Sequence, residues 1–539
     1  MIKPTVNIRI PYLLGDEHFE YALSLEEFNK LIGPKLDEAV QPIAVAMQKA
    51  GLRKEELGMV LLVGGSSQLP GIRERVWQQT GVEPHVIPRN LMYAVAYGAA
   101  LYHRRIFQLP VEKRDDRILG EDLGILVRDG SATLFRLMLP HNAKLPAKCK
   151  YDFEVSEGQD VVTINLRQGR STEVGGTKPL RSRNLHLKRT SDKITVHLEV
   201  DRNRLIRLRS FAPNDPENEI AMEVKNILEE QDLITLRKQF GLEVAASKEK
   251  SVTVPGEQLC IGIDVGTTTS EVAYTTPADS SILECLENSS DVPGEYDSYS
   301  YPSVVYFPSG WQSPEIANTT AFHAVEDRDK QRLAFESFKI EDWFRPLGII
   351  EGQEVTVQIL TAHLLSKMWR DAKEYFSEIT ALRSAVVTVP AAFGPDECLE
   401  MYNAAKLAGI EEVILIDEPT AAFLYYQSEF PDIAGADIRT ILVFDFGGGT
   451  ADVAILDVSE APYVTSGNYR HILFEVLATA GNQNCGGKHI DLLLASHLES
   501  IFQKKTGLSL KDVPAARSRL RSHAKKAKEE LSNLAIIME

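Results

Sequence analysis

Cysteine is scarce in this sequence. The chain of 539 residues contains only five cysteines, and no two of them form a C-x-x-C pair. A disulfide framework needs paired cysteines, and a structural zinc module needs closely spaced thiolate or imidazole ligands. The sequence therefore argues against both kinds of stabilisation, and it favours a protein that works in a reducing compartment.

Long apolar runs and an excess of positive charge are also missing. No stretch approaches the roughly 18 apolar residues that a membrane-spanning helix needs, and residues 1–7 lack the apolar core of a signal peptide. Lysine and arginine number 59 against 76 aspartates and glutamates, which gives a formal net charge of −17. Such an acidic chain is unsuited to coating nucleic acid or an anionic membrane. We therefore expect a cytoplasmic protein that has neither as its partner.

The remaining composition is that of a globular protein. Apolar residues make up 44% of the chain and charged residues 25%, which is ordinary usage, and the length allows about three or four domains. Residues 1–108 mix helical and strand patterns. The apolar run Met59–Val63, stopped by two glycines, is typical of a buried parallel strand. Ser24, followed by apolar residues at helical spacing, predicts a helix that begins at Leu25.

The rest of the chain divides into an all-β part and a second α/β part. Residues 160–167 and 193–200 alternate at period two, which predicts strands of an all-β domain at 120–220. Residues 221–242 predict one amphipathic helix, and a polar linker follows it. In the third zone, 258–539, strand-like runs again alternate with helical segments, as in sheets that helices cover.

One short pattern occurs twice in the third zone. A strand ends in aspartate and runs into a glycine- and threonine-rich turn, once as I-G-I-D-V-G-T-T-T-S at 261–270 and once as V-F-D-F-G-G-G-T-A-D at 443–452. Glycines let backbone N–H groups approach phosphate oxygens, threonine hydroxyls add donors, and an aspartate can hold Mg²⁺ through its water shell. One such turn alone is typical of an ordinary hairpin. Two copies predict two lobes that clamp one nucleotide from opposite sides.

A further acidic position lies between the two copies. Glu418 follows the apolar run Val413–Ile416, which predicts a buried strand. A carboxylate at this point can reach a metal-bound water at the end of the strand. An equally good interpretation is a carboxylate at a helix N-terminus, which the helix dipole favours.

These segments resemble the ATPase domain of the 70-kDa heat-shock (Hsp70) chaperone family, within the actin-like ATPase superfamily. The run A-G-N-Q-N-C-G-G at 480–487 resembles the glycine pair that the family places at the phosphates, and L-V-G-G-S-S-Q-L-P at 62–70 resembles its nucleoside-binding turn. Residues 120–220 resemble its β-sandwich peptide-binding domain. The resemblance implies a two-lobed α/β actin-like ATPase domain with ribonuclease H-like halves, plus an all-β sandwich.

The order of the motifs differs from that of the family. There, the nucleoside turn follows the phosphate motifs, and the peptide domain closes the chain. Here, the turn near residue 65 comes first, the sandwich segment second and the phosphate hairpins last. A circular permutation and a segment of a head-to-tail tandem array both explain this order. The two halves of the nucleotide domain are then complementary within one chain, or between neighbouring chains that associate.

The resemblance divides the chain into five segments. Residues 1–108 correspond to the C-terminal part of the nucleotide-binding domain, 109–119 to an interdomain linker and 120–220 to the sandwich. Residues 221–257 form a short helix and linker, too short for the family's lid. Residues 258–539 correspond to the N-terminal part of the nucleotide-binding domain, with lobe I and part of lobe II. We expect ATP or ADP and Mg²⁺ as cofactors, and unfolded or extended peptide segments and co-chaperones as partners.

The resemblance also implies roles for individual residues. Asp264, Asp445 and Glu418 would position Mg²⁺ and the attacking water. The two aspartates would hold the metal through water, and Asp445 is a candidate proton acceptor. Lys339 aligns with the family's catalytic lysine, for in-line attack of water on the γ-phosphate. The implied phosphate contacts are Gly266, Thr267, Thr268, Gly447, Gly448, Gly449, Thr450, Gly486 and Gly487. The implied nucleoside contacts are Gly64, Gly65, Ser66, Lys528 and Ser532.

Several positions depart from the family's pattern. Gln68 and Glu529 stand where two arginines sandwich the adenine, and Lys525 replaces a ribose-binding glutamate. The implied function is that of an ATP-dependent chaperone, which hydrolyses ATP and holds exposed hydrophobic peptide segments. The departures leave open a non-hydrolysing nucleotide-binding scaffold. A filament-forming or sugar-kinase-like member of the superfamily is a further alternative, against which the β-sandwich argues.

Overall fold

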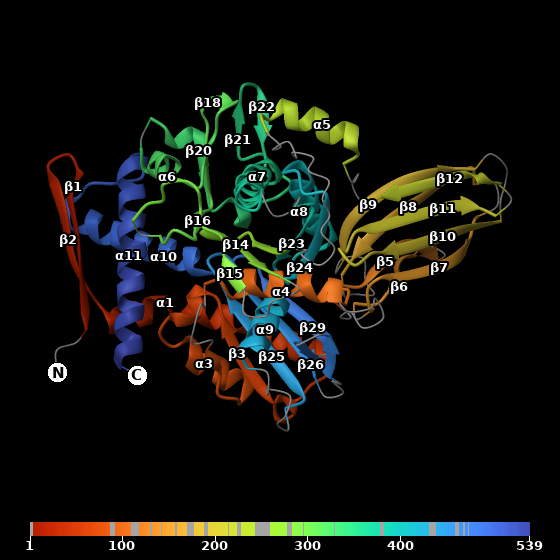
Figure 1. Cartoon of the computed structure of the whole chain (residues 1–539), viewed down its shortest axis with the longest axis horizontal. Helices are drawn as coiled ribbons and strands as arrows, with labels where there is room; N and C mark the ends of the chain where they lie inside the picture. Colours follow the sequence, from red (N-terminus) through yellow and green to blue (C-terminus); the bar gives the residue numbers. More distant parts are fainter. Residues whose placement is uncertain are drawn as a thin grey trace.

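Two large sheets with their helices form the main body of this computed structural model, and a pair of smaller antiparallel sheets projects from one side (Figure 1). The structure describes residues 4–86, 92–108, 118–129, 132–141, 143–156, 159–169, 177–187, 192–213, 215–223, 228–242, 259–276, 283–294, 296–327, 329–377, 382–430, 438–458, 463–466, 469–472 and 474–538.

The first large sheet carries the first glycine–threonine turn. Its strand order is β15-β14-β13-β23-β24, with β16 paired to β14. Strands β13, β23 and β24 run parallel, whereas β13 and β14 form an antiparallel hairpin. Every residue of β23 is buried, as expected of a strand that is covered on both faces. The strands span Cys260–Asp264 (β13), Thr269–Thr275 (β14), Leu283–Cys285 (β15), Tyr301–Pro302 (β16), Ser384–Val389 (β23) and Glu412–Asp417 (β24).

The second large sheet combines strands from both ends of the chain. Its order is β29-β26-β25-β3-β4. The run predicted as a buried parallel strand is β3 (Met59–Val63), which lies parallel to β25 (Thr440–Phe446) with Leu62 opposite Phe444. This confirms the prediction for that run, and the partner strand lies far away in the sequence. The other strands span His85–Val86 (β4), Ala451–Asp457 (β26) and Glu475–Asn482 (β29).

Two helices lie between the large sheets. Helix α4 (Ala94–Gln108) packs on α9 (Glu418–Glu429), and their apolar residues share a buried cluster with strands of both sheets. The helices approach closely, because a Cβ atom on Gly98 would lie 1.7 Å from the carbonyl oxygen of Ala421. Gly262 of β13 allows a similar approach, since its Cβ would lie 2.2 Å from the Ala100 nitrogen. The glycines thus fix the distance between the two halves of the main body.

The two ends of the described chain also meet outside the sheets. Helix α11 (Pro514–Met538) packs beside β1 (Thr5–Leu14), as Figure 1 shows. The Arg519 guanidinium donates hydrogen bonds to the carbonyl oxygens of Pro11 and Tyr12, at 2.7 and 2.9 Å. Around them lie β2 (Glu17–Ser24), α1 (Leu25–Ala39), α2 (Gln41–Ala50), α3 (Ile72–Thr80) and α10 (Gly487–Thr506). Ser24 Oγ accepts the Glu27 N–H at 3.1 Å and caps α1, as predicted.

The projecting part consists of two four-stranded antiparallel sheets around one apolar core. We call residues 118–223 the two-sheet unit. The strand orders are β6-β5-β8-β9 and β12-β11-β10-β7. The alternating segments at 160–167 and 193–200 form strands β8 and β10, as predicted. The strands span Leu123–Asp129 (β5), Ala132–Leu139 (β6), Ala147–Glu154 (β7), Val161–Gln168 (β8), Lys178–His186 (β9), Lys193–Val200 (β10), Ile206–Ala212 (β11) and Asp215–Glu223 (β12).

The prediction of a single helix over residues 221–242 is wrong. Strand β12 continues to Glu223, where it pairs with Arg207 of β11, and the helix α5 covers only Glu230–Gln239. Pairing with β11 stabilises residues 221–223 as a strand, and this stabilisation exceeds their weak preference for a helix. Residues 109–117 of the expected linker and all of 243–257 lie outside the described residues.

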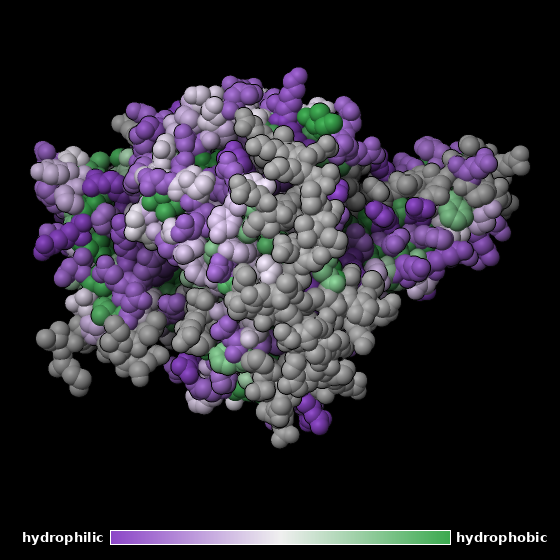
Figure 2. All heavy atoms as spheres, viewed as in Figure 1, coloured by the Kyte–Doolittle hydropathy of each residue, from purple (hydrophilic) through white to green (hydrophobic). Residues whose placement is uncertain are grey.

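The remaining elements complete the main body. They are α6 (Thr319–Glu326), α7 (Val357–Tyr375), α8 (Pro395–Leu407), β17 (Val304–Tyr306), β18 (Pro308–Trp311), β19 (Glu315–Ile316), β20 (Ala334–Glu336), β21 (Gly348–Ile350), β22 (Gln353–Val355), β27 (Tyr463–Ser466), β28 (Tyr469–Ile472) and short 3₁₀ turns at Lys54–Glu56, Gly65–Gln68, Gln331–Leu333 and Phe338–Ile340. On the face shown in Figure 2, hydrophilic side chains cover most of the described surface. No helix within the described residues is long and apolar enough to span a membrane.

Candidate functional site

The two glycine–threonine turns face each other across one cleft. The cleft has a volume of about 530 Å³ and takes residues from both turns and from the segment after β3. The turns approach so closely that a Cβ atom on Gly449 would lie 2.3 Å from Thr267 Oγ1, and one on Gly448 would lie 2.8 Å from Thr268 Oγ1. A side chain at Gly449 would therefore clash with Thr267, and one at Gly448 would require Thr268 to shift. The predicted phosphate contacts that line the cleft are Gly266, Thr267, Thr268, Gly447, Gly448, Gly449, Thr450 and Gly487.

The N-terminus of helix α10 supports the second turn. The Gly487 and Lys488 N–H groups donate to the carbonyl oxygens of Gly447 and Gly448, at 3.1 and 2.7 Å. Gly486 packs behind the turn, where its Cβ would lie 2.6 Å from the Gly449 nitrogen, and it is not among the residues that line the cleft. A glycine-rich turn beside a helix N-terminus offers a positive partial charge, which suits phosphate oxygens.

Each hairpin brings a pair of acidic residues to its base. The strand register places Asp264 opposite Glu271 and Asp445 opposite Asp452, and all four carboxyl groups are buried or nearly so. Asp264 Oδ1 accepts a hydrogen bond from Thr388 Oγ1 at 2.5 Å, which orients this carboxyl group. Because directly opposed residues share one face of a hairpin, Glu271 joins Asp264 in lining the cleft.

Lys339 is a buried lysine that lies beside the carboxyl groups in the cleft. Its Nζ lies 2.5 Å from Glu418 Oε1, and both side chains are almost completely buried. Burial raises the pKa of Asp445 well above its usual range, and the neighbouring Glu418 carboxylate adds to the shift. Burial also raises the pKa of Glu418 to about 8, against the opposing effect of Lys339. The cleft floor therefore carries more acidic groups than positive charge, and it favours a bound cation.

The donor set fits a magnesium ion held through water. Mg²⁺ prefers oxygen ligands and usually keeps several of its waters, and carboxyl groups provide the oxygen atoms at the floor of this cleft. Among the described residues, no three His, Cys, Asp or Glu side chains converge closely enough to chelate a metal directly. Asp264, the last residue of β13, and Asp445, next to the last residue of β25, both line the cleft beside the glycine–threonine turns.

The raised pKa of Glu418 predicts a pH dependence of the empty protein's stability. The pKa of about 8 in the folded chain exceeds the ordinary value of 4.5. The stabilisation by this protonated group is therefore fully present below the ordinary pKa and is lost as the pH rises through the folded pKa. We expect the thermal midpoint, measured without nucleotide or Mg²⁺, to fall between about pH 5 and pH 8. Glu418→Gln should flatten this decline, whereas the exposed control Glu20→Gln should not; equal slopes in all three proteins would contradict the assignment.

The segment after β3 contributes the third wall of the cleft. Gly64 has a positive φ of 79°, and a Cβ atom there would lie 2.5 Å from Asp445 Oδ1. Ser66 Oγ donates a hydrogen bond to the carbonyl oxygen of Gly447 at 2.7 Å. Gly65 also lines the cleft. The turn predicted to bind the nucleoside is thus joined directly to the second glycine–threonine turn, although the two are far apart in the sequence.

Helix α11 provides the fourth wall. Lys528 Nζ forms an ion pair with Asp491 at 2.8 Å and lies 3.3 Å from the carbonyl oxygen of Gly487. Ser532 Oγ donates to the Lys528 carbonyl oxygen at 2.8 Å, and both residues line the cleft. Lys525, a position that departs from the family's pattern, lies over the Tyr296 ring at 4.9 Å on the opposite wall.

The sequence reasoning missed several residues of the cleft, among them Glu271, Asp491 and Tyr296. Glu271 could have been found from its position, because it mirrors Asp264 across the turn of a hairpin. Asp491 lies four residues after Gly487, one turn into α10, and so faces the same side as the glycine. Tyr296 lies in an irregular segment, and no pattern in the sequence indicates that it reaches α11.

Comparison with known proteins agrees with these features. The family model described as Hsp70 protein matches residues 3–254 and 323–537 of the chain. Over 272 residues the chain is 34% identical to the chaperone protein DnaK of Elusimicrobium minutum (strain Pei191), an alignment that covers 50% of this chain and 40% of that protein. The chain therefore matches less than half the length of this relative. Because the family model covers well over half of the chain on both sides of the cleft, the chain belongs to the Hsp70 family.

Proposed function

We propose that this chain is an ATP-dependent chaperone, which binds and hydrolyses ATP in the cleft and holds extended peptide on the two-sheet unit. The observation that carries the proposal is the meeting of two glycine–threonine turns from different sheets above buried carboxyl groups. Two facing turns can hold a phosphate chain from both sides, and the acidic floor supplies the place for Mg²⁺. Membership of the Hsp70 family supports the same function.

The architecture in this proposal is a two-lobed actin-like ATPase domain with ribonuclease H-like halves. Residues 1–108 and 258–539 form it together, 109–119 are the linker, 120–220 the peptide-binding sandwich and 221–257 a short connecting segment. The parallel pairing of β3 with β25 and the contact of α11 with β1 support a nucleotide domain that closes within one chain.

The catalytic roles follow from the positions of the side chains. Asp264 and Asp445 hold the hydrated Mg²⁺, which when bound neutralises charge on the phosphate oxygens. Glu418, fixed by Lys339 at 2.5 Å, orients the attacking water. Asp445, which lines the cleft beside the second turn, is the proposed proton acceptor. The two turns hold the γ-phosphate in line with the water, so positioning and charge neutralisation drive the reaction.

The proposed nucleoside contacts are Gly64, Gly65, Ser66, Lys528 and Ser532. Gly64 packs closely against Asp445, and Gly65 lines the cleft beside the second turn. Gln68 and Glu529 line the same region, and neither can stack on adenine as arginine does. We therefore propose that the phosphate contacts provide most of the ATP affinity.

The peptide partner is proposed to lie along the exposed edges of the two-sheet unit. Leu134 and Leu137 on the edge strand β6 and Tyr151 on the edge strand β7 are exposed apolar side chains. An edge strand can pair its backbone with an extended peptide, while neighbouring apolar side chains receive those of the peptide. Co-chaperones are proposed as further partners, in line with family membership.

A peptide-release experiment tests the proposed function. The full chain is loaded with ADP, Mg²⁺ and a fluorescent leucine-rich heptapeptide, and ATP is then added in excess. We expect ATP to accelerate peptide release by at least about tenfold, because nucleotide state changes the population of the peptide-holding form. A charged heptapeptide of the same length is the control and should not bind. Peptide release at the same rate with ATP and ADP would contradict the proposal.

A further inference from the structure

The nucleotide cleft opens into a smaller side pocket. This side pocket has a volume of about 100 Å³ and lies between α6 and the helices α10 and α11, which Figure 1 shows close together. The two cavities share the lining residues Thr268, Tyr296, Lys488, Asp491 and Lys525. A group attached to a nucleotide in the cleft can therefore enter the side pocket.

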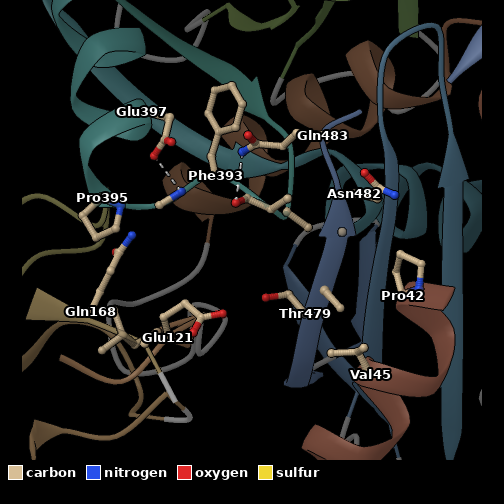
Figure 3. A pocket seen from close by; sticks show the side chains of 18 of the residues that line it. Pro42, Val45, Glu121, Gln168, Phe393, Pro395, Glu397, Thr479, Asn482 and Gln483 are labelled. Atoms are coloured by element: carbon tan, nitrogen blue, oxygen red, sulfur yellow. Dashed lines mark hydrogen bonds between the residues drawn. The ribbon is translucent and has the colours of Figure 1, made fainter. Parts of the chain in front are cut away.

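A larger cleft beside the two-sheet unit has no such connection. Its volume is about 630 Å³, and Figure 3 shows Gln168 and Glu121 of the two-sheet unit on one side of it, and Pro42 and Val45 of α2 on the other. Among the described residues, none that lines this cleft also lines the nucleotide cleft. A substituent on the bound nucleotide therefore meets the side pocket and not this larger cleft.

One face of α11 carries a row of positive charges from the nucleotide cleft into the side pocket. Arg521, Lys525 and Lys528 follow one another at spacings of four and three residues, which places them on one face of the helix. Lys528 lines the cleft, Lys525 lines both cavities and Arg521 lines the side pocket. Like charges at these spacings destabilise a helix. An anion bound along the row would relieve this repulsion.

Two ion pairs neutralise part of the charge at the side pocket. Lys528 Nζ lies 2.8 Å from the Asp491 carboxylate, and Lys488 Nζ lies 3.4 Å from the Glu336 carboxylate. Burial raises the pKa of Asp491, and the positive charges of Lys528, Lys525 and Lys488 all oppose this rise. Three lysines therefore surround one carboxylate where the cleft meets the side pocket.

The inner wall of the side pocket adds a further cation and several hydroxyl groups. Arg521 pairs with no carboxylate among the described residues. Besides the two acids of the ion pairs, Glu326 is the one carboxylate among the described residues that line the side pocket. Hydroxyl-bearing residues that line it include Thr268, Ser518 and Ser522. Ammonium, guanidinium and hydroxyl groups are the usual donors to phosphate oxygens.

The position of Lys525 indicates which part of a nucleotide these donors meet. Lys525 lies one turn of α11 before Lys528, a proposed nucleoside contact. Its Nζ donates to the Tyr296 hydroxyl at 3.2 Å and lies 4.9 Å from the centre of that ring, at the boundary between the cleft and the side pocket. At a ribose, a carboxylate accepts a hydroxyl group, whereas a cationic side chain accommodates a phosphate on the same oxygen. Lysine at this position thus favours a phosphorylated ribose.

We propose that the side pocket binds a phosphate group carried by the ribose of the nucleotide in the cleft. The ligand is then a nucleotide with a phosphate on its 2′ or 3′ oxygen, in addition to the phosphates on its 5′ oxygen. Arg521 and Lys525 hold the added phosphate, and the volume of the side pocket admits this group but not a second nucleoside. This inference rests on the proposed function of the cleft, and it specifies which nucleotides bind there best.

The test compares nucleotides that differ by one phosphate group. AMP, adenosine 2′,5′-bisphosphate and adenosine 3′,5′-bisphosphate are titrated into the full chain with Mg²⁺, and calorimetry gives the affinity of each. We expect one of the bisphosphates to bind at least about tenfold more tightly than AMP, because charge-assisted hydrogen bonds to a phosphate are strong. AMP with an equal concentration of inorganic phosphate should bind as AMP alone does, since the added phosphate has to be attached to the ribose.

Substitutions assign the gain in affinity to the side pocket. In Arg521→Gln, the bisphosphate should bind no more than about threefold more tightly than AMP, whereas Arg521→Lys should retain most of the gain. Lys526→Gln is the matched control, because Lys526 is an exposed lysine on the same helix outside both cavities. It should keep the wild-type ratio of affinities. Thermal unfolding without nucleotide shows whether each variant is folded.

Bisphosphates that bind no more tightly than AMP would overturn the inference, and this comparison needs only the wild-type chain. So would a gain that Arg521→Gln leaves unchanged, or an equal tightening of AMP binding by free phosphate. If ATP binds while the bisphosphates gain nothing over AMP, the inference fails alone. If neither ATP nor any of these nucleotides binds, the cleft does not hold nucleotides, and the proposed function fails with the inference.

Discussion

Asp445→Asn is expected to slow single-turnover ATP hydrolysis by on the order of a thousandfold, while ATP still binds. Asparagine has the shape of aspartate, so the close packing of Gly64 against this side chain is kept. It cannot accept the proton of the attacking water, and it removes one of the negative charges that hold the hydrated Mg²⁺. The rate is measured in a single turnover with excess protein, and the affinity by titration with a fluorescent ATP analogue.

The matched control for this substitution is Asp457→Asn. Asp457 lies at the other end of the same hairpin, outside the cleft. We expect it to leave the hydrolysis rate within about twofold of the wild type. If Asp445→Asn hydrolyses ATP as fast as the control, Asp445 is not the proton acceptor. If neither the wild type nor the variant hydrolyses ATP, the cleft binds nucleotide without turnover.

Gly449→Val is expected to weaken ATP binding by at least about 100-fold, or roughly 2.8 kcal/mol. A Cβ atom at this position would lie 2.2 Å from Ile340 Cγ2 and 2.3 Å from Thr267 Oγ1. The side chain therefore has to push the two phosphate turns apart, and the turns no longer hold one phosphate chain from both sides. Calorimetric titration with ATP and Mg²⁺ measures the loss.

Gly294→Val is the control for this second substitution. A Cβ atom on Gly294 meets no other atom within 4 Å, so valine finds open space there. It should bind ATP with the wild-type affinity. Thermal unfolding of both variants without nucleotide separates a loss of binding from a loss of the fold. Wild-type affinity in Gly449→Val would show that the contact of the two turns does not form the phosphate site.

Local patterns in the sequence were sufficient to predict the parts of the cleft that depend on turns and buried strands. The two glycine–threonine hairpins, the strand β3 and the position of Glu418 at a strand end are features of this kind. The two interpretations of Glu418 also prove compatible, because it is both the first residue of α9 and a residue of the cleft floor. Which strand neighbours β3 was not predicted, because β25 is remote in the sequence.

Features that depend on contacts between remote segments could not be predicted in this way. Strand β12 extends over residues expected to be helical, because it pairs with β11. Local propensity does not predict this pairing. Gly486 packs behind the second turn, and the neighbouring Gly487 lines the cleft. Arg204 belongs to no sequence motif, and its buried ion pair with Asp417 of strand β24 becomes visible only in the structure.

We propose that segments from both ends of one chain build a single ATP site. Sedimentation velocity with a fluorescent ATP analogue and Mg²⁺ tests this claim most directly, because it reports the mass of the species that carries the nucleotide. We expect nucleotide to sediment with a single chain, at one nucleotide per chain, over the whole concentration range. Nucleotide that sediments only with dimers or larger assemblies would contradict it, and would mean that the site forms between neighbouring chains.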